Sequence, residues 1–375
     1  MVVADFSRVL AGPLATMFLA DLGATVVKVE HPGTGDETRR WGPPFVDGTS
    51  AYYLSVNRNK RSVELDLRTP QGLADARELA RRADVLVENL RPGRMGDLGL
   101  GPDQLTEANP GLVYCSISGF GTGAGADLPG YDFVVQAVGG LLSITGPEGG
   151  PPTKVGVAMA DVLTGLHACI GVLAALQARR TTGRGQVVEV NLLSSLLASM
   201  VNQGSSYVTT GTVPSAMGNR HPSIAPYETL RAADAPLAVA VGNDRQFRAL
   251  CTALGMGGLA DDPRFADNAA RVAHREALAD ALESALAVGT AAHWVDVLGA
   301  VGVPCGPVND LAGAFALATR LGLEPVTTMP GHDGHPVAQL SNPVRLSATP
   351  PRYERPPPAL GADGGDVLAW LRDGR

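Results

Sequence analysis

Short apolar runs alternate with longer stretches of helical spacing over the first 190 or so residues. The apolar runs predict six β-strands, at residues 2–6, 24–30, 62–67, 84–89, 112–118 and 185–191. Between several of them lie segments with apolar positions three and four apart, at residues 15–22, 71–82 and 131–142. Alternation of this kind predicts an α/β fold with a parallel sheet covered by helices on both faces.

The longest helix is predicted over 161–180. Its apolar residues recur three or four apart, at Leu163, Leu166, Ile170, Leu173 and Leu176. Arginines at its end suit the negative pole of the helix dipole, and a glycine follows three residues later.

The pattern changes after a second apolar helix at 192–209. Residues 211–226 are rich in Gly, Pro and polar side chains and predict a linker. A smaller α+β unit follows, with strands at 227–231 and 237–241 and helices at 245–254, 271–287 and 291–301. A second loose stretch begins at 302–310, and the Pro-rich tail ends in a helix near 365–371.

Composition narrows the functional classes. The chain has 375 residues, of which 45% are hydrophobic and 18% charged, as in globular proteins. A net charge of −7 disfavours nucleic acid as a partner. The four cysteines lack paired spacing and the histidines show no metal-binding motif, so no metal site is expected. Without a signal peptide or an apolar run of membrane length, we expect a cytoplasmic protein that does not cross a membrane.

Two segments partly match known catalytic or cofactor-binding motifs, but the residues around them do not fit those motifs. The glycines of 121–126 match a dinucleotide fingerprint but follow about the fifth strand and lead into DLPG, so a flexible loop is expected and NAD is not. Ser194 and Ser195 lack the glycine-flanked elbow of hydrolases. Two groups of basic residues lie near predicted strand ends, where α/β sheets bind ligands, although each alone is typical of a solvated surface. They are Arg58, Lys60, Arg61 and Arg68, and Arg91 and Arg94.

Asp161 stands at the head of the long apolar helix and permits two interpretations. On local sequence it is an N-cap, because Asp favours that position. The same place could instead keep a buried carboxylate ionised, since a helix N-terminus stabilises negative charge. An ionised carboxylate held against an electrophile is what covalent carboxylate catalysis requires.

Taken together, several segments resemble the class III CoA-transferase family, which also contains 2-methylacyl-CoA racemases. The resemblance covers most of the chain and rests on the order and spacing of its segments. They are DFSRVLAGPLATMFLADLGATVVKVEHPGTGD, NRNKRSVELDLRTPQG, DVLVENLRPG, GYDFVVQAVGGLLSITG, ADVLTGLHACIGVLAALQARRTTGRGQVVEVNLL and GVPCGPVND.

The resemblance implies a Rossmann-like large domain built from both chain ends and a small domain between them, in two ring-shaped subunits that interlock as a homodimer. The implied bounds are 1–200 for the first part of the large domain, 201–226 for a linker, 227–302 for the small domain, 303–333 for a second linker and 334–375 for the return.

The family's nucleophilic aspartate falls on Asp161. The implied contacts to coenzyme A are Val9, Leu10, Ala11, His31, Leu65, Arg68, Asn89, Leu90, Arg91, Tyr131 and Asp132. Arg94 is a further candidate, because a CoA-binding arginine of some members aligns near Asp97.

The implied reaction moves CoA between an acyl-CoA and a small carboxylic acid through an aspartyl anhydride and an aspartyl-CoA thioester, without a metal or redox cofactor. Tyr131 stands where the racemases have a histidine, which favours a transferase. Leu10 replaces a glutamine of formyl-CoA transferases, so oxalate/formate exchange is not expected. The alternatives are a racemase, a non-catalytic acyl-CoA-binding homologue and, more remotely, a nicotinamide-dependent dehydrogenase.

Overall fold

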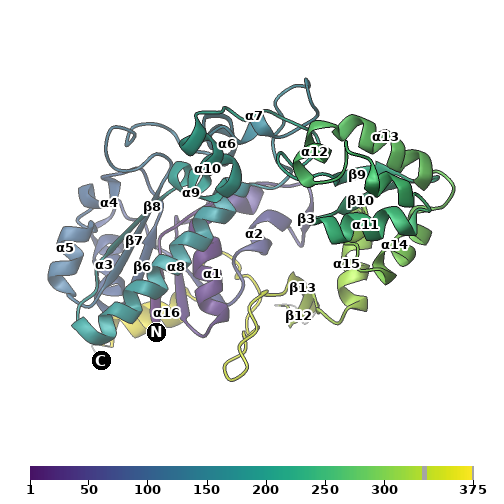
Figure 1. Cartoon of the computed structure of the whole chain (residues 1–375). Helices are drawn as coiled ribbons and strands as arrows, with labels where there is room; N and C mark the ends of the chain where they lie inside the picture. Colours follow the sequence, from purple (N-terminus) through teal and green to yellow (C-terminus); the bar gives the residue numbers. More distant parts are fainter. Residues whose placement is uncertain (332–335, 374–375) are drawn as a thin grey trace. The chain divides into compact units, whose positions relative to one another are not determined.

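Six strands form one parallel sheet in the computed structural model (Figure 1). Five lie within a predicted apolar run, and the strand at Lys60–Glu64 begins two residues before the run predicted at 62–67. Across the sheet the order is β5 (Lys60–Glu64), β2 (Thr25–Glu30), β1 (Val2–Asp5), β6 (Val85–Glu88), β7 (Val113–Ser118) and β8 (Val187–Asn191). Every neighbouring pair is parallel. The predicted α/β class with a parallel sheet is therefore confirmed.

Helices cover both faces of this sheet, each over its own apolar core. On one face lie α1 (Ala11–Asp21), α8 (Met159–Thr182) and α9 (Leu192–Ser199). On the other lie α3 (Pro70–Arg82), α5 (Pro102–Ala108) and α16 (Gly364–Arg372). Successive strand residues alternate between the cores, as Val3 and Ala4 do, because side chains of a strand point to opposite faces.

The start of α8 lies directly against the start of α1. A Cβ on Gly165 would stand 2.6 Å from the carbonyl oxygen of Ala11, a distance that no larger residue tolerates. Glycine therefore lets the two helices approach closely. This contact brings the first turn of α8 beside the loop that joins β1 to α1, at the carboxyl edge of the sheet.

The chain divides into two compact units. Unit 1 comprises Met1–Leu141, Val155–Thr212 and Glu324–Arg375, and unit 2 comprises Leu142–Lys154 and Val213–Leu323. The structure describes residues 1–331 and 336–373, so positions 332–335 of the predicted second linker and return segment, and residues 374–375, lie outside the described residues. The domain bounds drawn from the sequence stay predictions.

Unit 2 contains an antiparallel sheet of β11 (Cys305–Pro307), β10 (Pro236–Ala240) and β9 (Tyr227–Arg231). Around it lie α11 (Asp244–Ala253), α12 (Asn268–Ala273), α13 (Arg275–Leu286) and α14 (Ala291–Ala300). Its own core includes Phe247, Leu282 and Trp294. Helix α15 (Leu311–Arg320) lies in the stretch expected as a linker and has no buried residue.

Other elements of unit 1 were not predicted from the sequence. They are the 3₁₀ turn η1 (Glu37–Arg40), the hairpin β3 (Phe45–Val46) and β4 (Thr49–Ser50), α2 (Ala51–Ser55), α4 (Arg94–Asp97) and the hairpin β12 (Val326–Pro330) and β13 (Pro336–Leu340). Two predicted helices are each broken in two. The breaks separate α6 (Asp132–Val138) from α7 (Leu141–Ile144), and α9 from α10 (Val201–Thr210).

By length and composition alone, α8 is the one helix among the described residues that could cross a membrane. Its buried positions, which include Ala168, Val172 and Ala175, belong to the core it shares with α1 and the sheet. A core helix passes the same test of length and apolarity, so α8 is explained by its packing in unit 1.

Candidate active site

Asp161 is the third residue of α8, not the residue that precedes the helix. The helix begins at Met159, and its N-cap position is held by Ala158, which makes no side-chain cap. Instead, Asp132 Oδ1 accepts hydrogen bonds from the backbone N–H groups of Ala160 at 2.7 Å and of Asp161 at 3.3 Å. The capping interpretation of Asp161 is therefore wrong, and its carboxylate is left for another role.

The charge environment of Asp161 is also opposite to the one expected at a helix start. Burial and, to a lesser extent, the nearby Asp132 carboxylate together raise the pKa of Asp161 to about 7. The N–H groups that could have stabilised the anion are engaged elsewhere. Those of Ala160 and Asp161 bond to Asp132, and that of Val162 bonds to the carbonyl of Ala158. Near neutral pH both protonation states of Asp161 are populated.

Asp161 lines a cleft of about 490 Å³ at the carboxyl edge of the sheet in unit 1. The cleft brings together seven of the residues singled out from the sequence: Val9, Ala11, Asn89, Leu90, Arg91, Tyr131 and Asp161. They come from the ends of β1 and β6, from the loop before α6 and from the first turn of α8. Strand ends of an open parallel sheet are the usual ligand-binding edge.

A second cleft of about 400 Å³ adjoins the first. It is lined by His31, Leu65, Arg68 and Arg94, and it shares Arg8, Leu90 and Arg91 with the first cleft. Two predicted contacts line neither cleft. The side chain of Leu10 is buried at the N-cap of α1, and Asp132 is the cap of α8 described above.

The arginines of the second cleft are exposed and only loosely engaged. Arg68 pairs with Asp66 at 2.8 Å, Arg94 lies 3.7 Å from Asp97, and Arg91 pairs with Asp127. Exposed pairs of this kind are weak. Their guanidinium groups can therefore turn to an anionic ligand at little cost, and Arg is well suited to phosphate.

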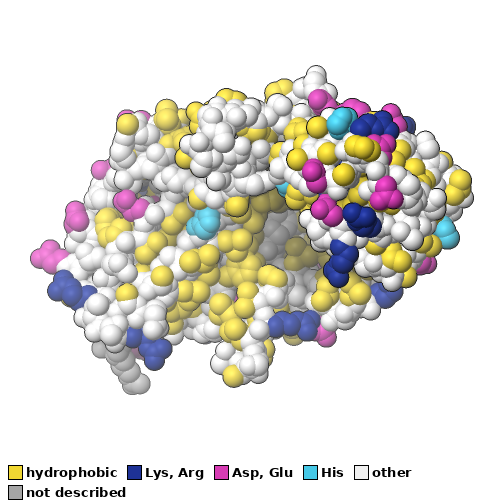
Figure 2. Space-filling model, in the orientation of Figure 1, with side chains coloured by type: hydrophobic (Ala, Val, Ile, Leu, Met, Phe, Trp, Pro, Cys, Tyr) yellow, Lys and Arg dark blue, Asp and Glu magenta, His cyan; other side chains and the backbone are white. Residues whose placement is uncertain are grey.

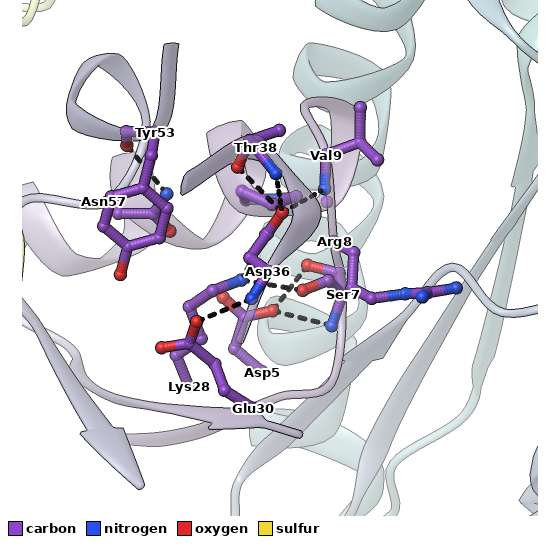
Figure 3. A network of polar contacts seen from close by, with 12 residues as sticks. Asp5, Ser7, Arg8, Val9, Lys28, Glu30, Asp36, Thr38, Tyr53 and Asn57 are labelled. Atoms are coloured by element: carbon purple, nitrogen blue, oxygen red, sulfur yellow. Dashed lines mark hydrogen bonds and ion pairs between the residues drawn. The ribbon is translucent and has the colours of Figure 1, made fainter. Parts of the chain in front are cut away.

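Arg8 was missed by the sequence analysis, although it lines both clefts. Among the described residues, no ion-pair partner of its exposed guanidinium is found, and in Figure 3 the side chain points away from the buried polar network. The available signal was position, because Arg8 follows the carboxyl end of the first strand directly.

A network of buried charges holds the loop between β1 and α1 (Figure 3). Lys28 Nζ donates to the carbonyl of Ser7 and to Asp36 Oδ2, each at 2.9 Å. Asp36 Oδ1 in turn accepts from the N–H of Val9 at 3.4 Å. Val9 has a φ of 68°, a strained conformation for a β-branched residue. The network therefore fixes an unfavourable turn at the cleft wall.

The backbone of the preceding residue, Arg8, is held by hydrogen bonds from the end of β6. Asn89 Oδ1 accepts from the backbone N–H of Arg8 at 2.8 Å, and Asn89 Nδ2 donates to the carbonyl of Arg8 at 2.7 Å. Asn89 follows β6 and lines the cleft itself. Its amide is thus a bridge between two strand ends.

The sequence analysis was wrong about part of the first basic group. Arg58 and Lys60 are buried rather than on a solvated face. Arg58 pairs with Asp21 at 2.6 Å, and Lys60 pairs with Asp5 at 3.0 Å. Burial alone would raise the pKa of Asp5, but Lys60, Lys28 and two hydroxyl donors together lower it to about 2. These cations are engaged by buried carboxylates and are not available to a ligand.

This arrangement places one partly buried carboxylate beside a cleft with a cationic rim, and within residues 1–331 and 336–373 no hydrogen-bond donor to its oxygens is found. Such a carboxylate can act as a nucleophile or base near neutral pH, while the rim suits a ligand with phosphate groups. Among the described residues no cluster of three His, Cys, Asp or Glu side chains could hold a metal ion.

Known proteins resemble this chain over nearly its whole length. The family model described as CoA-transferase family III matches residues 1–364. The chain is 43% identical to succinate–glutarate CoA-transferase from Agrobacterium fabrum, over 98% of this chain and 94% of that protein. It is 42% identical to acetyl-CoA:oxalate CoA-transferase from Acetobacter aceti, over 95% and 90% of the two chains.

A solved structure agrees with the sequence matches. A CAIB/BAIF family protein from Brucella suis superposes with a TM-score of 0.87 at 41% identity, covering 99% of this chain and 98% of the other. The relatives carry transferase names at this identity over nearly the whole chain. This chain therefore belongs to CoA-transferase family III, and within it to the transferase branch rather than the 2-methylacyl-CoA racemase branch.

Proposed function

We propose that Asp161 is the nucleophile that carries CoA from an acyl-CoA thioester to a free carboxylic acid. The observation that carries the proposal is the Asp161 carboxylate itself. It is partly buried, lines the cleft formed by strand ends, and receives no hydrogen bond from the first turn of its helix. An anion with so little stabilisation is more reactive toward a carbonyl carbon than a solvated one.

The proposed transfer of CoA proceeds through a mixed anhydride and an aspartyl-CoA thioester. An oxygen of ionised Asp161 bonds to the thioester carbonyl carbon and the C–S bond breaks, which gives a mixed anhydride and CoA thiolate. The thiolate then bonds to the Asp161 carbonyl carbon and expels the donor acid as its carboxylate. An acceptor carboxylate attacks the resulting aspartyl-CoA thioester, and the same two steps run in reverse. No net proton or electron is required.

We place the CoA moiety in the second cleft, with its phosphates at the exposed arginines. Arg8, Arg68, Arg91 and Arg94 supply cations there, and His31 and Leu65 supply flatter surface. The shared lining at Leu90 and Arg91 lets the thioester end extend into the first cleft toward Asp161. In this placement the predicted CoA contacts that line the two clefts would all bind the same CoA thioester.

The substrate class that we propose is a short dicarboxylic acid and its CoA thioester. The names of relatives support it, because they act on succinate and glutarate or on oxalate. The replacement at Leu10 argues against formate as the partner acid, but oxalate with another donor stays open. Initial rates over a panel of acyl-CoA donors and mono- and dicarboxylate acceptors test the class. We expect dicarboxylates to exceed monocarboxylates of equal length.

Trapping the intermediate tests the mechanism. The protein is incubated with an acyl-CoA donor, quenched with hydroxylamine or borohydride, and digested for mass spectrometry. We expect modification at Asp161 in the wild type and none in Asp161→Asn, because a neutral amide cannot form the anhydride. Turnover in Asp161→Asn at the wild-type rate would refute the assignment.

Two alternatives make different predictions. A racemase would exchange the α-proton of a chiral 2-methylacyl-CoA with D2O. We expect no exchange, because Tyr131 occupies the position of the racemase histidine. A non-catalytic binding protein would bind CoA thioesters equally well with and without Asp161 and turn over none. Calorimetry on Asp161→Ala together with the rate assay separates that case from ours.

We also propose that the protein works as an interlocked homodimer in the cytoplasm. Unit 1 supports the dimer with an apolar surface over α8 (Figure 2), to which exposed side chains of α10 are added. Ile170 is 63% exposed, Val201 72% and Val208 80%. Helix α10 has no buried residue at all. An apolar surface of this kind indicates a partner.

A further inference from the structure

Two side chains of α6 hold the start of α8. Asp132 uses both carboxylate oxygens, because Oδ1 accepts from the N–H groups of Ala160 and Asp161 while Oδ2 accepts from Gln136 Nε2 at 2.7 Å. The contact spans 28 residues of sequence. It is therefore a tertiary cap supplied by another helix, where most helices are capped by the residue that precedes them.

Gln136 extends this hold to the segment before α8. Its side chain is fully buried. Its Nε2 also donates to the carbonyl of Val157 at 3.3 Å, and its Oε1 accepts from the N–H of Val155 at 3.1 Å. A buried amide with both ends bonded has one orientation. Asp132 and Gln136 together thus fix the backbone from Val155 to Asp161.

The same contacts determine what surrounds the Asp161 carboxylate. Asp132 takes the N–H groups that would otherwise stabilise an anion in the first turn, and it places a second negative charge nearby. Other charged or titratable groups face the cleft from the neighbouring elements. They are Arg8 after β1, Glu37 of η1, Arg91 after β6, and Asp127 and Tyr131 before α6. Tyr52 of α2 is also close enough to feel the charge of Asp161.

We propose that Asp132 and Gln136 are positioning residues for the nucleophile, in addition to and resting on the function proposed above for Asp161. Gln136 fixes where the carboxylate stands. Asp132 also fixes the position of the Asp161 carboxylate and keeps its anion poorly stabilised. The unfavourable negative charge on Asp161 is therefore lost when its oxygen bonds to the acyl carbon. On this proposal Asp132 does not contact CoA, whereas the family resemblance had implied that it does.

Two variants separate the two parts of the role. Asp132→Asn removes the charge and keeps an amide oxygen for the two helix N–H groups, but its amide nitrogen cannot accept the hydrogen bond from Gln136 Nε2. Gln136→Met removes the hydrogen bonds without changing charge. The measurements are kcat and kcat/KM across pH 5 to 9, trapping of the thioester at Asp161, and affinity for CoA.

We expect Asp132→Asn to move the acidic limb of kcat/KM to lower pH, because the pKa of Asp161 falls when the like charge is removed. Its kcat at alkaline pH should fall by less than about tenfold. Gln136→Met should lose about 10–100-fold in kcat, since small displacements of a reacting group are costly, with the acidic limb in place. Affinity for CoA should hold in both variants.

The outcomes distinguish this inference from the proposed function. An unlabelled, inactive wild type would defeat the function. A labelled wild type whose acidic limb is unmoved in Asp132→Asn, or a Gln136→Met variant with full kcat, would overturn the inference. A second measurement needs no turnover. The stability difference between Asp161→Asn and its parent should stop growing with pH at a lower pH in the Asp132→Asn background, because the difference levels off at the folded-state pKa of Asp161. An unchanged levelling-off pH would also overturn the inference.

Discussion

At the scale of single residues, Asp161 is placed where its charge is unfavourable. Burial and Asp132 raise its pKa from 3.8 to about 7, so the folded protein binds a proton there that the unfolded chain releases at much lower pH. Between those two values the folded state loses stability as pH rises. Above pH 7 the full penalty is present. A carboxylate that destabilises the folded state in this way is typical of a residue with a functional role rather than a structural one.

Replacing this carboxylate should therefore stabilise the protein in a way that depends on pH. Asp161→Asn has nearly the same shape and no charge. We expect it to be more stable than the wild type at pH 8 by about 2–4 kcal/mol. The difference should shrink as pH falls below 7 and vanish near pH 4, where Asp161 is protonated in both states. Urea unfolding at several pH values measures it.

Asp66 provides the control for this experiment. Its side chain is only half-buried at the surface, and hydrogen bonds from Arg68 lower its pKa. Asp66→Asn should give no gain in stability at alkaline pH, because removing a favourably placed surface charge can only be neutral or slightly destabilising. If Asp161→Asn were no more stable than the wild type at pH 8, the carboxylate would not be under the strain described here.

The reaction rate should follow the same ionisation in the opposite sense. The nucleophile must be ionised, so kcat/KM should rise with pH and level off above about pH 7. Below that value it should fall about tenfold for each pH unit, as expected for one ionisation. Rates with one donor and one acceptor between pH 5 and 9 measure the profile. A flat profile down to pH 5 would show that Asp161 is ionised throughout.

The sequence predicted which residues line much of the site. It did not predict which residues form hydrogen bonds or ion pairs with one another. Val9, Asn89, Arg91 and Tyr131 were named and do line the cleft with Asp161. Local sequence could not show that Asp161 is not the cap of its own helix, because the capping carboxylate of Asp132 lies 29 residues earlier. Lys60 was interpreted as a surface residue for the same reason, since its partner Asp5 is 55 residues away.

At the scale of elements, the loop between β1 and α1 depends on charges that no apolar pattern reveals. Lys28 and Asp36 are both fully buried and pair at 2.9 Å. Burial lowers the pKa of Lys28, but Asp36, Asp5 and Glu30 more than offset it and the pKa is raised. The lysine therefore stays charged in the interior, where it bonds to the carbonyl of Ser7. The loop that forms the cleft wall is thus fixed by an ion pair.

Breaking this pair should be costly. Lys28→Met leaves the Asp36 carboxylate buried without its cation, and we expect a loss of about 3–5 kcal/mol in unfolding free energy. Adding Asp36→Asn removes the stranded charge and keeps an oxygen for the N–H groups of Val9 and Thr38. The double variant should recover at least about 1 kcal/mol, within the usual range of coupling between contacting residues. Chemical denaturation of the four proteins in the cycle measures both.

An exposed cation serves as the matched control for that cycle. Arg81 pairs with Glu78 on the surface of α3, with its side chain 57% exposed. Arg81→Met should cost less than about 1 kcal/mol. A loss of similar size in Lys28→Met would mean that the buried pair contributes no more than a surface one, contrary to the geometry of the network.

Most strands were predictable because each is a short run rich in apolar residues, as expected where both faces of a sheet are covered. The strand at Lys60–Glu64 is less regular, because Lys60 and Arg61 precede its apolar position. Elements without such a run were missed. The hairpin at Phe45–Val46 and Thr49–Ser50 is too short to show a period. Helix α15 was assigned to a linker because Pro and Gly precede it, although Leu311–Arg320 is helical. The split at α9 and α10 falls where Val201 has a positive φ of 33°, which apolarity cannot indicate.

At the scale of the whole molecule, the surface over α8 to α10 carries more apolar side chains than an isolated chain needs. Leu166, Ile170 and Leu173 lie one or two turns apart on α8, and each is at least 38% exposed. The periodicity predicted correctly that these residues share a face, but their burial in a core could not be inferred from it. In unit 1 the core takes Ala168, Val172 and Ala175 from the same helix instead.

If this surface is covered by a second copy of the chain, one charge placed in it should separate the copies. Ile170→Glu puts a carboxylate where a partner would have to desolvate it, which costs several kcal/mol. Ala108→Glu on α5, over the opposite face of the sheet, is the matched control because Ala108 is also exposed and helical.

Light scattering after gel filtration should give twice the mass of one chain for the wild type and for Ala108→Glu. Ile170→Glu should give a lower mass or aggregate, because interlocked chains that cannot pair leave their apolar surfaces uncovered. A wild-type mass of a single chain, or a dimer unaffected by Ile170→Glu, would show that this surface faces something other than a second copy.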